Sequence, residues 1–246
     1  MIEQPRKPTG IVCGNRVWPA VAGYELVSAY YDEWYWQSFW VANERPLIVE
    51  EIEKLGSHAS PALDVGTGTG LYIRALARLG VECVGIDASK AMLDEAKKDL
   101  SASVRLICGS INKLPFSDKA FSLITACRVL SHVVSLNNAI RELGRVTKTG
   151  GKLIISDVSP FHNYTTTRIP TPDGDVHIET YKHTVDQLAV AAEDSEYWKV
   201  DYIKSVAYKD LLWKPEPSEY PAIDVSSARP IFFYGVLTRI AKQQSG

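Results

Sequence analysis

Short, mostly apolar blocks alternate with longer amphipathic stretches between residues 61 and 156. The blocks cover residues 61–65, 81–86, 104–108, 121–126 and 152–156. Continuous apolar runs of this length are typical of strands that are buried on both faces. The stretches at 71–79, 89–100 and 135–146 carry apolar residues at helical spacing. Strand and helix therefore alternate, which predicts an α/β fold with a parallel sheet covered on both sides by helices.

The two ends of the chain depart from this alternation. Residues 1–22 read as an irregular arm, and residues 23–55 as helical. After Asp157 the composition shifts to Thr, Pro, His and Tyr, and Pro172-Asp173-Gly174 predicts a hairpin between residues 168–171 and 176–181. Thr184 can cap a further helix, and residues 202–208 and 231–240 read as strands. We expect one domain over residues 1–246, with residues 158–184 as an insertion.

Composition narrows the range of partners. The chain has 246 residues, 46% hydrophobic and 23% charged, which fits one domain with a full-sized core. A net charge of −2 gives no reason to expect nucleic acid as a partner. No apolar run approaches the ~20 residues of a membrane span, and the polar N-terminus lacks a signal-peptide core. The four cysteines show no metal-ligand spacing. These features predict a cytoplasmic protein without membrane contact or a metal, and they leave its oligomeric state open.

A glycine-rich turn follows the first apolar block. Gly66, Gly68 and Gly70 lie in Asp64-Val-Gly-Thr-Gly-Thr-Gly, and Asp87 ends the second block about twenty residues later. A glycine turn followed by an acidic strand end holds a nucleoside ribose in α/β folds. Leu71 stands at the position where the dinucleotide pattern G-x-G-x-x-G requires its third glycine. No Gly-Lys-Ser/Thr follows, which excludes a P-loop.

The spacing D-x-G-x-G-x-G resembles motif I of class I S-adenosylmethionine (SAM)-dependent methyltransferases. Four later segments resemble the other motifs of that family in order: 85–89 with 92–93, 109–111 with 114–116, 121–124 with 129–133, and 143–146 with 150–153. The resemblance spans about two-thirds of the chain. It implies a seven-stranded Rossmann-like methyltransferase sheet, with six parallel strands and the last antiparallel, and an N-terminal helical lid within residues 1–55.

The resemblance also implies a set of residues that bind SAM, and its product S-adenosylhomocysteine (SAH). Asp64 would accept from the ammonium group, directly or through water, and Asp87 from the ribose hydroxyls. The helix start after Gly70 would face the carboxylate. Ser110 stands where the family usually has an acid. The cofactor-binding set is Tyr31, Asp64, Gly66, Thr67, Gly68, Gly70, Asp87, Ala88, Met92, Ser110, Ile111, Cys127 and Arg128. Met92 fits the hydrophobic core equally well, and Cys127 and Arg128 could contribute backbone alone.

Aromatic residues are concentrated before the first block, where eight rings lie between Tyr24 and Trp40. The run Tyr30 to Trp34 resembles the lid that closes over SAM and the methyl acceptor in related enzymes. A lid excludes water from the reaction, and aromatic faces tolerate a sulfonium charge. Tyr31 is therefore a candidate for cofactor contact and for catalysis. The alternative is that these rings only dock the lid onto the core.

Candidate bases and acceptor contacts are His132, His162 and His183, together with Tyr31. His132 follows the fourth strand, near the expected methyl position, although packing alone would also explain it. His162 and His183 flank the hairpin insertion, which resembles a cap over the acceptor pocket in some small-molecule methyltransferases. Asp157 could bind an amine or cap a turn.

The sequence thus predicts SAM-dependent methyl transfer to a small, aromatic or amphipathic metabolite, with a nitrogen, oxygen or carbon acceptor. Three alternatives stay open: carbon methylation of an electron-rich ring such as indole or a quinone precursor, a non-catalytic SAM-binding partner subunit, and a nicotinamide dehydrogenase. Ala126-Cys-Arg-Val129 replaces the Asn-Pro-Pro-Tyr type of motif that marks base methylation in nucleic acids. No acid cluster suggests a catalytic divalent metal.

Overall fold

The computed structural model describes residues 10–12, 15–161, 165–216 and 228–241. Its main feature is a seven-stranded sheet in the order β10-β11-β7-β6-β3-β4-β5. The strands are β3 (Ala62–Val65), β4 (Cys83–Asp87), β5 (Arg105–Cys108), β6 (Phe121–Cys127), β7 (Thr147–Val158), β10 (Trp198–Ala207) and β11 (Pro230–Arg239). Pairing is parallel from β7 to β5, and β11 runs antiparallel to both of its neighbours. The predicted sheet is confirmed, including its antiparallel last strand.

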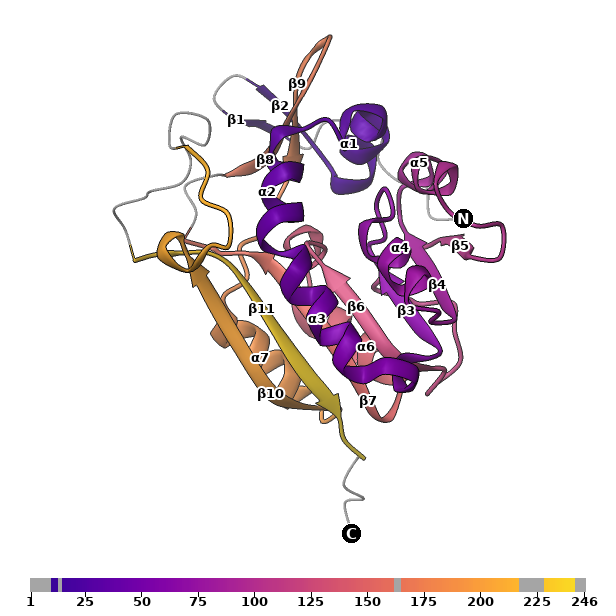
Figure 1. Ribbon diagram of the computed structural model, residues 1–246. Helices are drawn as coiled ribbons and strands as arrows, with labels where there is room; N and C mark the ends of the chain where they lie inside the picture. Colours follow the sequence, from indigo (N-terminus) through magenta and orange to yellow (C-terminus); the bar gives the residue numbers. More distant parts are fainter. Residues whose placement is uncertain (1–9, 13–14, 162–164, 217–227, 242–246) are drawn as a thin grey trace.

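Helices cover both faces of this sheet (Figure 1). On one face lie α2 (Tyr35–Asn43), α3 (Arg45–Leu55) and α4 (Leu71–Arg78), and on the other α6 (Leu136–Val146) and α7 (Val185–Asp194). Each layer has its own hydrophobic core. Phe39, Ile48 and Leu76 pack with Leu123 and Phe232 on the first face. On the second face, the apolar positions of α6 and α7 pack on β3, β6 and β7.

Side-chain caps fix where several helices begin. Helix α5 (Lys90–Lys98) starts after Ser89, whose hydroxyl accepts from the Met92 amide at 3.2 Å. Ser135 caps α6 in the same way, and Thr184 with Gln187 forms a capping box at α7. These hydroxyls satisfy amides that have no partner within the helix. The predicted helix starts at Ser89, Ser135 and Thr184 are thus confirmed.

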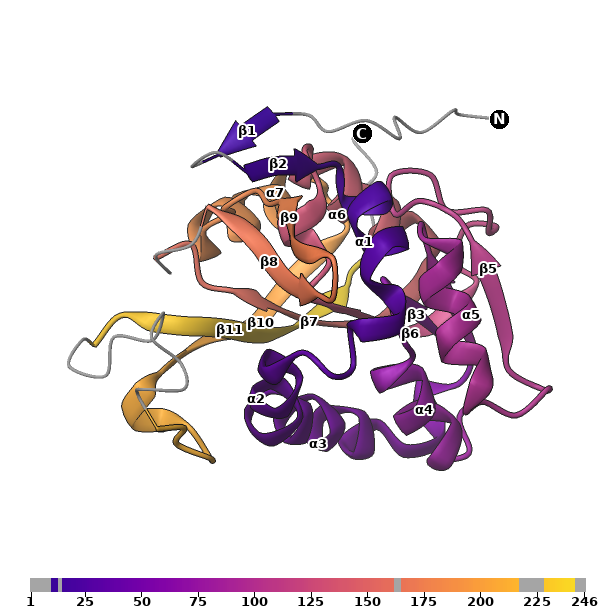
Figure 2. The same cartoon turned by 90° about the horizontal axis from the view of Figure 1, so that it is seen from above.

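A second, four-stranded sheet lies over the carboxyl ends of the large one (Figure 2). Its order is β1 (Gly10–Val12), β2 (Asn15–Trp18), β9 (Gly174–Glu179) and β8 (Thr166–Thr171). Strands β8 and β9 are the predicted hairpin. Over the described residues 15–22 the prediction of an irregular arm is wrong, because β2 pairs in parallel with β9, with Val17 opposite His177, and α1 begins at Ala20. An unpaired strand edge offers free backbone donors and acceptors to any short extended segment.

Helix α1 (Ala20–Val27) continues from β2 and packs on the same hairpin. Val27, Ile169 and Ile178 form a small buried cluster there. Gly23 makes the close approach possible, because a Cβ atom at this position would lie 2.6 Å from Cγ1 of Ile178. We call residues 15–34 together with β8 and β9 the roof, and the loops that follow β3, β4, β5 and β6 the floor.

The helical stretch predicted over residues 23–55 is broken into α1, the 3-10 turn Ser28–Tyr30, α2 and α3. Within the described part of the chain, no helix combines the length and apolar character that crossing a membrane would require.

Candidate functional site

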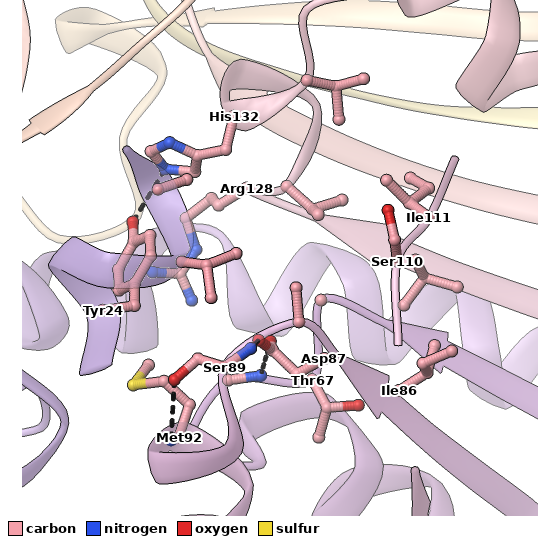
Figure 3. Close-up of a pocket in the computed structure, with 18 of the residues that line it drawn as sticks. Tyr24, Thr67, Ile86, Asp87, Ser89, Met92, Ser110, Ile111, Arg128 and His132 are labelled. Carbon is pink, nitrogen blue, oxygen red and sulfur yellow. Dashed lines mark hydrogen bonds between the residues drawn. The ribbon is translucent and has the colours of Figure 1, made fainter. Parts of the chain in front are cut away.

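A cavity of about 320 Å³ lies between roof and floor (Figure 3). The floor contributes residues from all four loops, and the roof contributes Pro19 to Val21, Tyr24, Tyr31 and Glu179, with Tyr181 lining the cavity just after β9. The carboxyl edge of a parallel sheet is where ligands bind in open α/β folds. Each part of the cavity wall presents a different chemistry.

The glycine loop after β3 passes directly along the cavity. Gly66 and Gly68 adopt φ angles of 70° and 55°, which side chains other than glycine rarely accept. A Cβ atom on Gly66 would also lie 2.7 Å from Val129. Gly66, Thr67 and Gly68 line the cavity, whereas Gly70 lies outside the lining and caps the start of α4. The loop therefore presents bare backbone to a ligand.

Asp64 is buried behind this loop rather than in the lining. Its Oδ1 accepts from the Thr125 hydroxyl at 2.6 Å. Its Oδ2 is buried and has no hydrogen-bond partner among the described residues. Burial raises the pKa of this carboxyl to about 6. An unpaired buried carboxylate oxygen calls for a donor from outside the protein or from water.

Asp87 ends β4 and is held from both sides. Its Oδ2 accepts from the Gly68 amide and its Oδ1 from the Ser89 amide, both at 2.8 Å. Burial raises the pKa of Asp87. Each carboxylate oxygen can accept more than one hydrogen bond, so both remain able to bind hydroxyl groups in the cavity.

Beyond Asp87 the floor becomes less polar. Ala88, Met92, Ser110 and Ile111 line the cavity, and Asn112, which sequence reasoning missed, joins them. Met92 is 3% exposed, so the same side chain faces the cavity and packs in the core. The Ser110 hydroxyl accepts from the Asn112 amide at 3.2 Å.

Arg128 follows β6 and belongs to a buried polar network. Its Nε lies 2.9 Å from Glu44 Oε2, and its Nη1 donates to the Tyr31 hydroxyl at 3.3 Å. Glu44 is fully buried and also accepts from the Tyr72 hydroxyl at 2.7 Å and from the Ser156 hydroxyl at 2.6 Å. Arg128, Tyr31, Tyr72 and Cys127 line the cavity. Glu44 thus fixes a guanidinium group at the cavity wall.

His132 joins the floor to the roof. Its Nδ1 lies 3.0 Å from the Glu179 carbonyl oxygen, which can only accept, so Nδ1 carries the proton. Burial lowers the pKa of His132 to about 4, so the ring is neutral near pH 7 and its Nε2 accepts from the Tyr24 hydroxyl at 2.8 Å. Because its hydroxyl proton is donated to His132, the Tyr24 oxygen can only accept further hydrogen bonds.

Two acidic side chains of the roof also bind the floor. Glu25 accepts from the Ser89 hydroxyl at 3.0 Å and from the Ala91 amide at 3.2 Å. Asp32 accepts from the Thr69 hydroxyl at 2.6 Å. Together with the Tyr24 and Tyr31 contacts, these bonds hold the roof against three floor loops.

The remaining candidate residues from the sequence, His183 and Asp157, do not line the cavity. His183 donates from Nε2 to the Val133 carbonyl at 2.7 Å. His162 falls outside the described residues. Asp157 accepts from the Ser131 and Val158 amides, which is the turn-capping alternative. No group of three or more His, Cys, Asp or Glu side chains in the described ranges could hold a metal ion.

Sequence reasoning missed the cavity residues Gln37, Tyr72, Glu179 and Tyr181, and gave Tyr24 no specific role. Gln37 and Tyr24 lie in the aromatic segment, which signalled a lid without indicating the direction of each side chain. Glu179 and Tyr181 lie at the end of the predicted hairpin, and only its pairing with β2 brings them over the cavity.

Comparison with known proteins matches residues 63–155 to a family model described as a methyltransferase domain. The chain is 33% identical over 98 residues to a biotin biosynthesis bifunctional protein BioHC of Cellvibrio japonicus, covering 40% of this chain and 20% of that protein. It is 38% identical over 97 residues to a demethylmenaquinone methyltransferase of Corynebacterium urealyticum, covering 39% and 41%. A demethylmenaquinone methyltransferase of Mycolicibacterium gilvum is 28% identical over 176 residues, covering 64% and 72%.

Among solved structures, a DhpI–SAH complex has a similar fold, with a TM-score of 0.64 at 16% identity over 90% of this chain and 96% of that one. The chain spans less than half the length of the BioHC and Corynebacterium relatives. The residues matched by the family model include all four floor loops and end before β8 and β9.

Proposed function

The chain belongs to the class I, Rossmann-like SAM-dependent methyltransferases, and we propose from this that it transfers the methyl group of SAM to a small-molecule acceptor. The observation that carries the proposal is the unpaired Oδ2 of Asp64 behind a bare glycine loop. A buried acceptor there suits the ammonium group of SAM, reached directly or through water. Net charge −2 supports a small molecule over nucleic acid. The buried or unclustered thiols agree with a cytoplasmic protein.

The remaining cavity residues fit the other parts of SAM. Asp87 would accept from the ribose hydroxyls, because both of its oxygens keep free lone pairs. Ala88, Met92 and Ile111 offer apolar contact to adenine. Ser110 and Asn112 supply polar groups where the family usually has an acid. Thr67, Cys127 and Arg128 complete the wall near the methionyl part.

When bound, SAM supplies an electrophilic methyl group on a sulfonium. The protein must align the acceptor with that group, exclude water and take up a proton if the acceptor carries one. The roof would exclude water through its contacts with Ser89, Thr69 and His132. Residues 1–55 and 158–184 would thus act as lid and cap of a single domain over residues 1–246.

We assign the acceptor to the side of the cavity between Tyr24, His132 and Tyr181. Val129, Val133 and Val134 add apolar surface there, which supports an aromatic or amphipathic acceptor. The Tyr24 oxygen, backed by His132, can accept a hydrogen bond from an acceptor O–H or N–H. His183 would act indirectly, by holding the Val133 backbone. His162 stays a prediction.

A second candidate is methylation at carbon of an electron-rich ring. The names of two relatives, both demethylmenaquinone methyltransferases, support a quinone-like acceptor. The third candidate, a SAM-binding subunit without activity of its own, has no specific observation in its favour. A nicotinamide dehydrogenase is disfavoured by the methyltransferase-domain match.

The substitution Asp87→Ala tests the proposed binding of SAM and SAH. Loss of hydrogen bonds to a buried carboxylate should weaken SAH binding by at least ~1–3 kcal/mol in calorimetry. Asp99→Ala, at an exposed position after α5, is the matched control and should leave SAH affinity unchanged. Equal SAH affinity for wild type and Asp87→Ala would remove the assignment of Asp87. Stabilisation by NAD in place of SAM would remove the methyltransferase proposal.

Methyl-labelled SAM and a small-molecule extract test the proposed methyl transfer to an acceptor. We expect label in an extractable metabolite, lost on Tyr24→Phe and on His132→Asn without loss of SAH affinity. Identification of the labelled atom then separates carbon from nitrogen or oxygen methylation. No transfer by wild-type protein that binds SAM would favour the partner-subunit alternative. Full turnover in both variants would remove Tyr24 and His132 from the reaction.

A further inference from the structure

Tyr24 and His132, on the acceptor side of the cavity, use all of their polar protons on the protein itself. Tyr24 donates its hydroxyl proton to Nε2 of His132 at 2.8 Å. Burial raises the pKa of Tyr24 well above its usual range, so the hydroxyl keeps its proton and the oxygen carries no charge. His132 donates from its other nitrogen, Nδ1, to the Glu179 carbonyl at 3.0 Å. A ligand beside this pair therefore meets an oxygen that can only accept a hydrogen bond.

Glu179 and Tyr181 continue the same arrangement at the end of β9, and both line the cavity. The Tyr181 hydroxyl donates to the Glu179 carboxylate, and burial together with this hydrogen bond raises the pKa of Tyr181. The Tyr181 amide donates to the Ser131 carbonyl at 2.7 Å, which holds the segment against the floor. The Tyr181 oxygen and the Glu179 carboxylate can thus only accept from a ligand. Since His132 contacts both Glu179 and Tyr24, these two residues flank one imidazole ring.

The rest of the acceptor side is apolar. Its side chains come from the start of α1 and from the loop after β6, and they are Pro19, Ala20, Val21, Val129, Val133 and Val134. Val134 is 74% exposed, so this apolar wall reaches the opening of the cavity. In Figure 3, Tyr24 and His132 lie across the cavity from Ser110 and Ile111, which we assign to adenine. Among the residues that the structure describes, the one charged side chain lining the acceptor side is therefore Glu179.

We propose that the acceptor of methyl transfer is a cationic amine, whose ammonium group binds between the Glu179 carboxylate and the Tyr24 oxygen while its apolar body packs on the valine side chains. The inference rests on the proposed function and deepens it, because it names the chemical class of the acceptor. An ammonium group offers only donors and a positive charge, which matches a wall of acceptor oxygens around one carboxylate. A carboxylate or phosphate in the same place would meet lone pairs and a like charge. The ammonium group is what the site recognises, whichever atom of the molecule is methylated.

The first test needs no variant and reads the charge of the labelled product. Wild-type protein is incubated with methyl-labelled SAM and a small-molecule extract, and the products are separated on a cation exchanger at pH 7. An enzyme-free control identifies SAM, which is itself a cation. We expect label in a second retained compound. Label in a neutral or anionic compound would overturn the proposal and leave the methyltransferase function intact, whereas no transfer at all would overturn the proposed function.

The second test is Glu179→Gln, which keeps the shape of the side chain and an oxygen for the Tyr181 hydroxyl but removes the charge. With the labelled compound as substrate, KM should rise about tenfold, the low end for a hydrogen bond between charged groups, because Glu179 is only partly buried. The kcat and the affinity for SAH should change less than about twofold, since neither depends on this ion pair.

Glu193→Gln, at an exposed position on α7, is the matched control and should leave KM, kcat and SAH affinity unchanged. An unchanged KM in Glu179→Gln would overturn the proposal. An equal loss of SAH affinity in that variant would also overturn it, because it would show that Glu179 supports the structure of the cavity as a whole.

Discussion

Floor and roof enclose the same cavity but are built in opposite ways. The floor consists of loops that each follow one strand of a parallel sheet, so each loop is a short continuous segment of the sequence. The roof joins residues 15–34 to a hairpin near residue 177. Continuous loops of this kind give sequence motifs with fixed spacing. Pairing between distant segments gives no fixed spacing in the sequence.

The two regions also differ in how they are held. Backbone amides fix Asp87, and positive φ angles fix the glycine loop. Side chains fix the roof, chiefly through Tyr24 with His132, Glu25 with Ser89, and Asp32 with Thr69. Side-chain bonds near the surface open at lower free energy than a buried sheet does. We therefore expect the roof to be the less stable of the two regions.

The largest effect is expected at Glu44, whose carboxylate forms an ion pair with Arg128 of the floor. Glu44→Ala would leave Arg128 without its carboxylate in a buried site and should lower the free energy of unfolding by ~3–5 kcal/mol. Urea denaturation measures the change. Glu53→Ala, at an exposed position on helix α3, which begins directly after Glu44, should stay within ~0.5 kcal/mol of wild type. Equal effects of the two substitutions would contradict the importance of the Glu44 network.

A smaller effect should separate the roof from the floor. Gly23→Ala would place a Cβ atom against Ile178 and should cost ~1–3 kcal/mol through overpacking. Hydrogen exchange should speed up in α1, β8 and β9 and remain slow in β3 and β6. Adding Ile178→Ala should relieve the clash, so that the double variant loses less than the sum of the single ones. Uniform acceleration across both regions would show that roof and floor open together.

The smallest effect is a pH dependence confined to the floor. Asp64 has a pKa of about 6 without ligand, and an ammonium partner would lower it. Binding of SAH then requires loss of a proton below pH 6, so affinity should fall as pH drops from 7 to 5, by at most ~1.4 kcal/mol per pH unit. Calorimetry in buffers of different ionisation enthalpy would detect the released proton. Asp64→Asn should abolish this dependence, and its persistence in that variant would assign the proton elsewhere.

Most of the large sheet and the floor follow from the sequence, because their information is local. The apolar blocks give the strands, Ser89 and Ser135 give the helix starts, and the glycine spacing gives the loop. The role of Glu44 could not be predicted, since its partners Arg128, Tyr72 and Ser156 lie on other elements. Residues 15–18 are too few to show strand periodicity, and only the free edge of β9 makes them a strand.

The pairing of β2 with β9 also sets an order of assembly. Val17 of β2 can pair with β9 only after His177 has been synthesised, and His177 is 160 residues further along the chain. At ~5–20 residues per second of synthesis, that interval is about 8–32 s. Five strands of the large sheet are already translated when β2 can find its partner. The floor can therefore form before the roof closes the cavity.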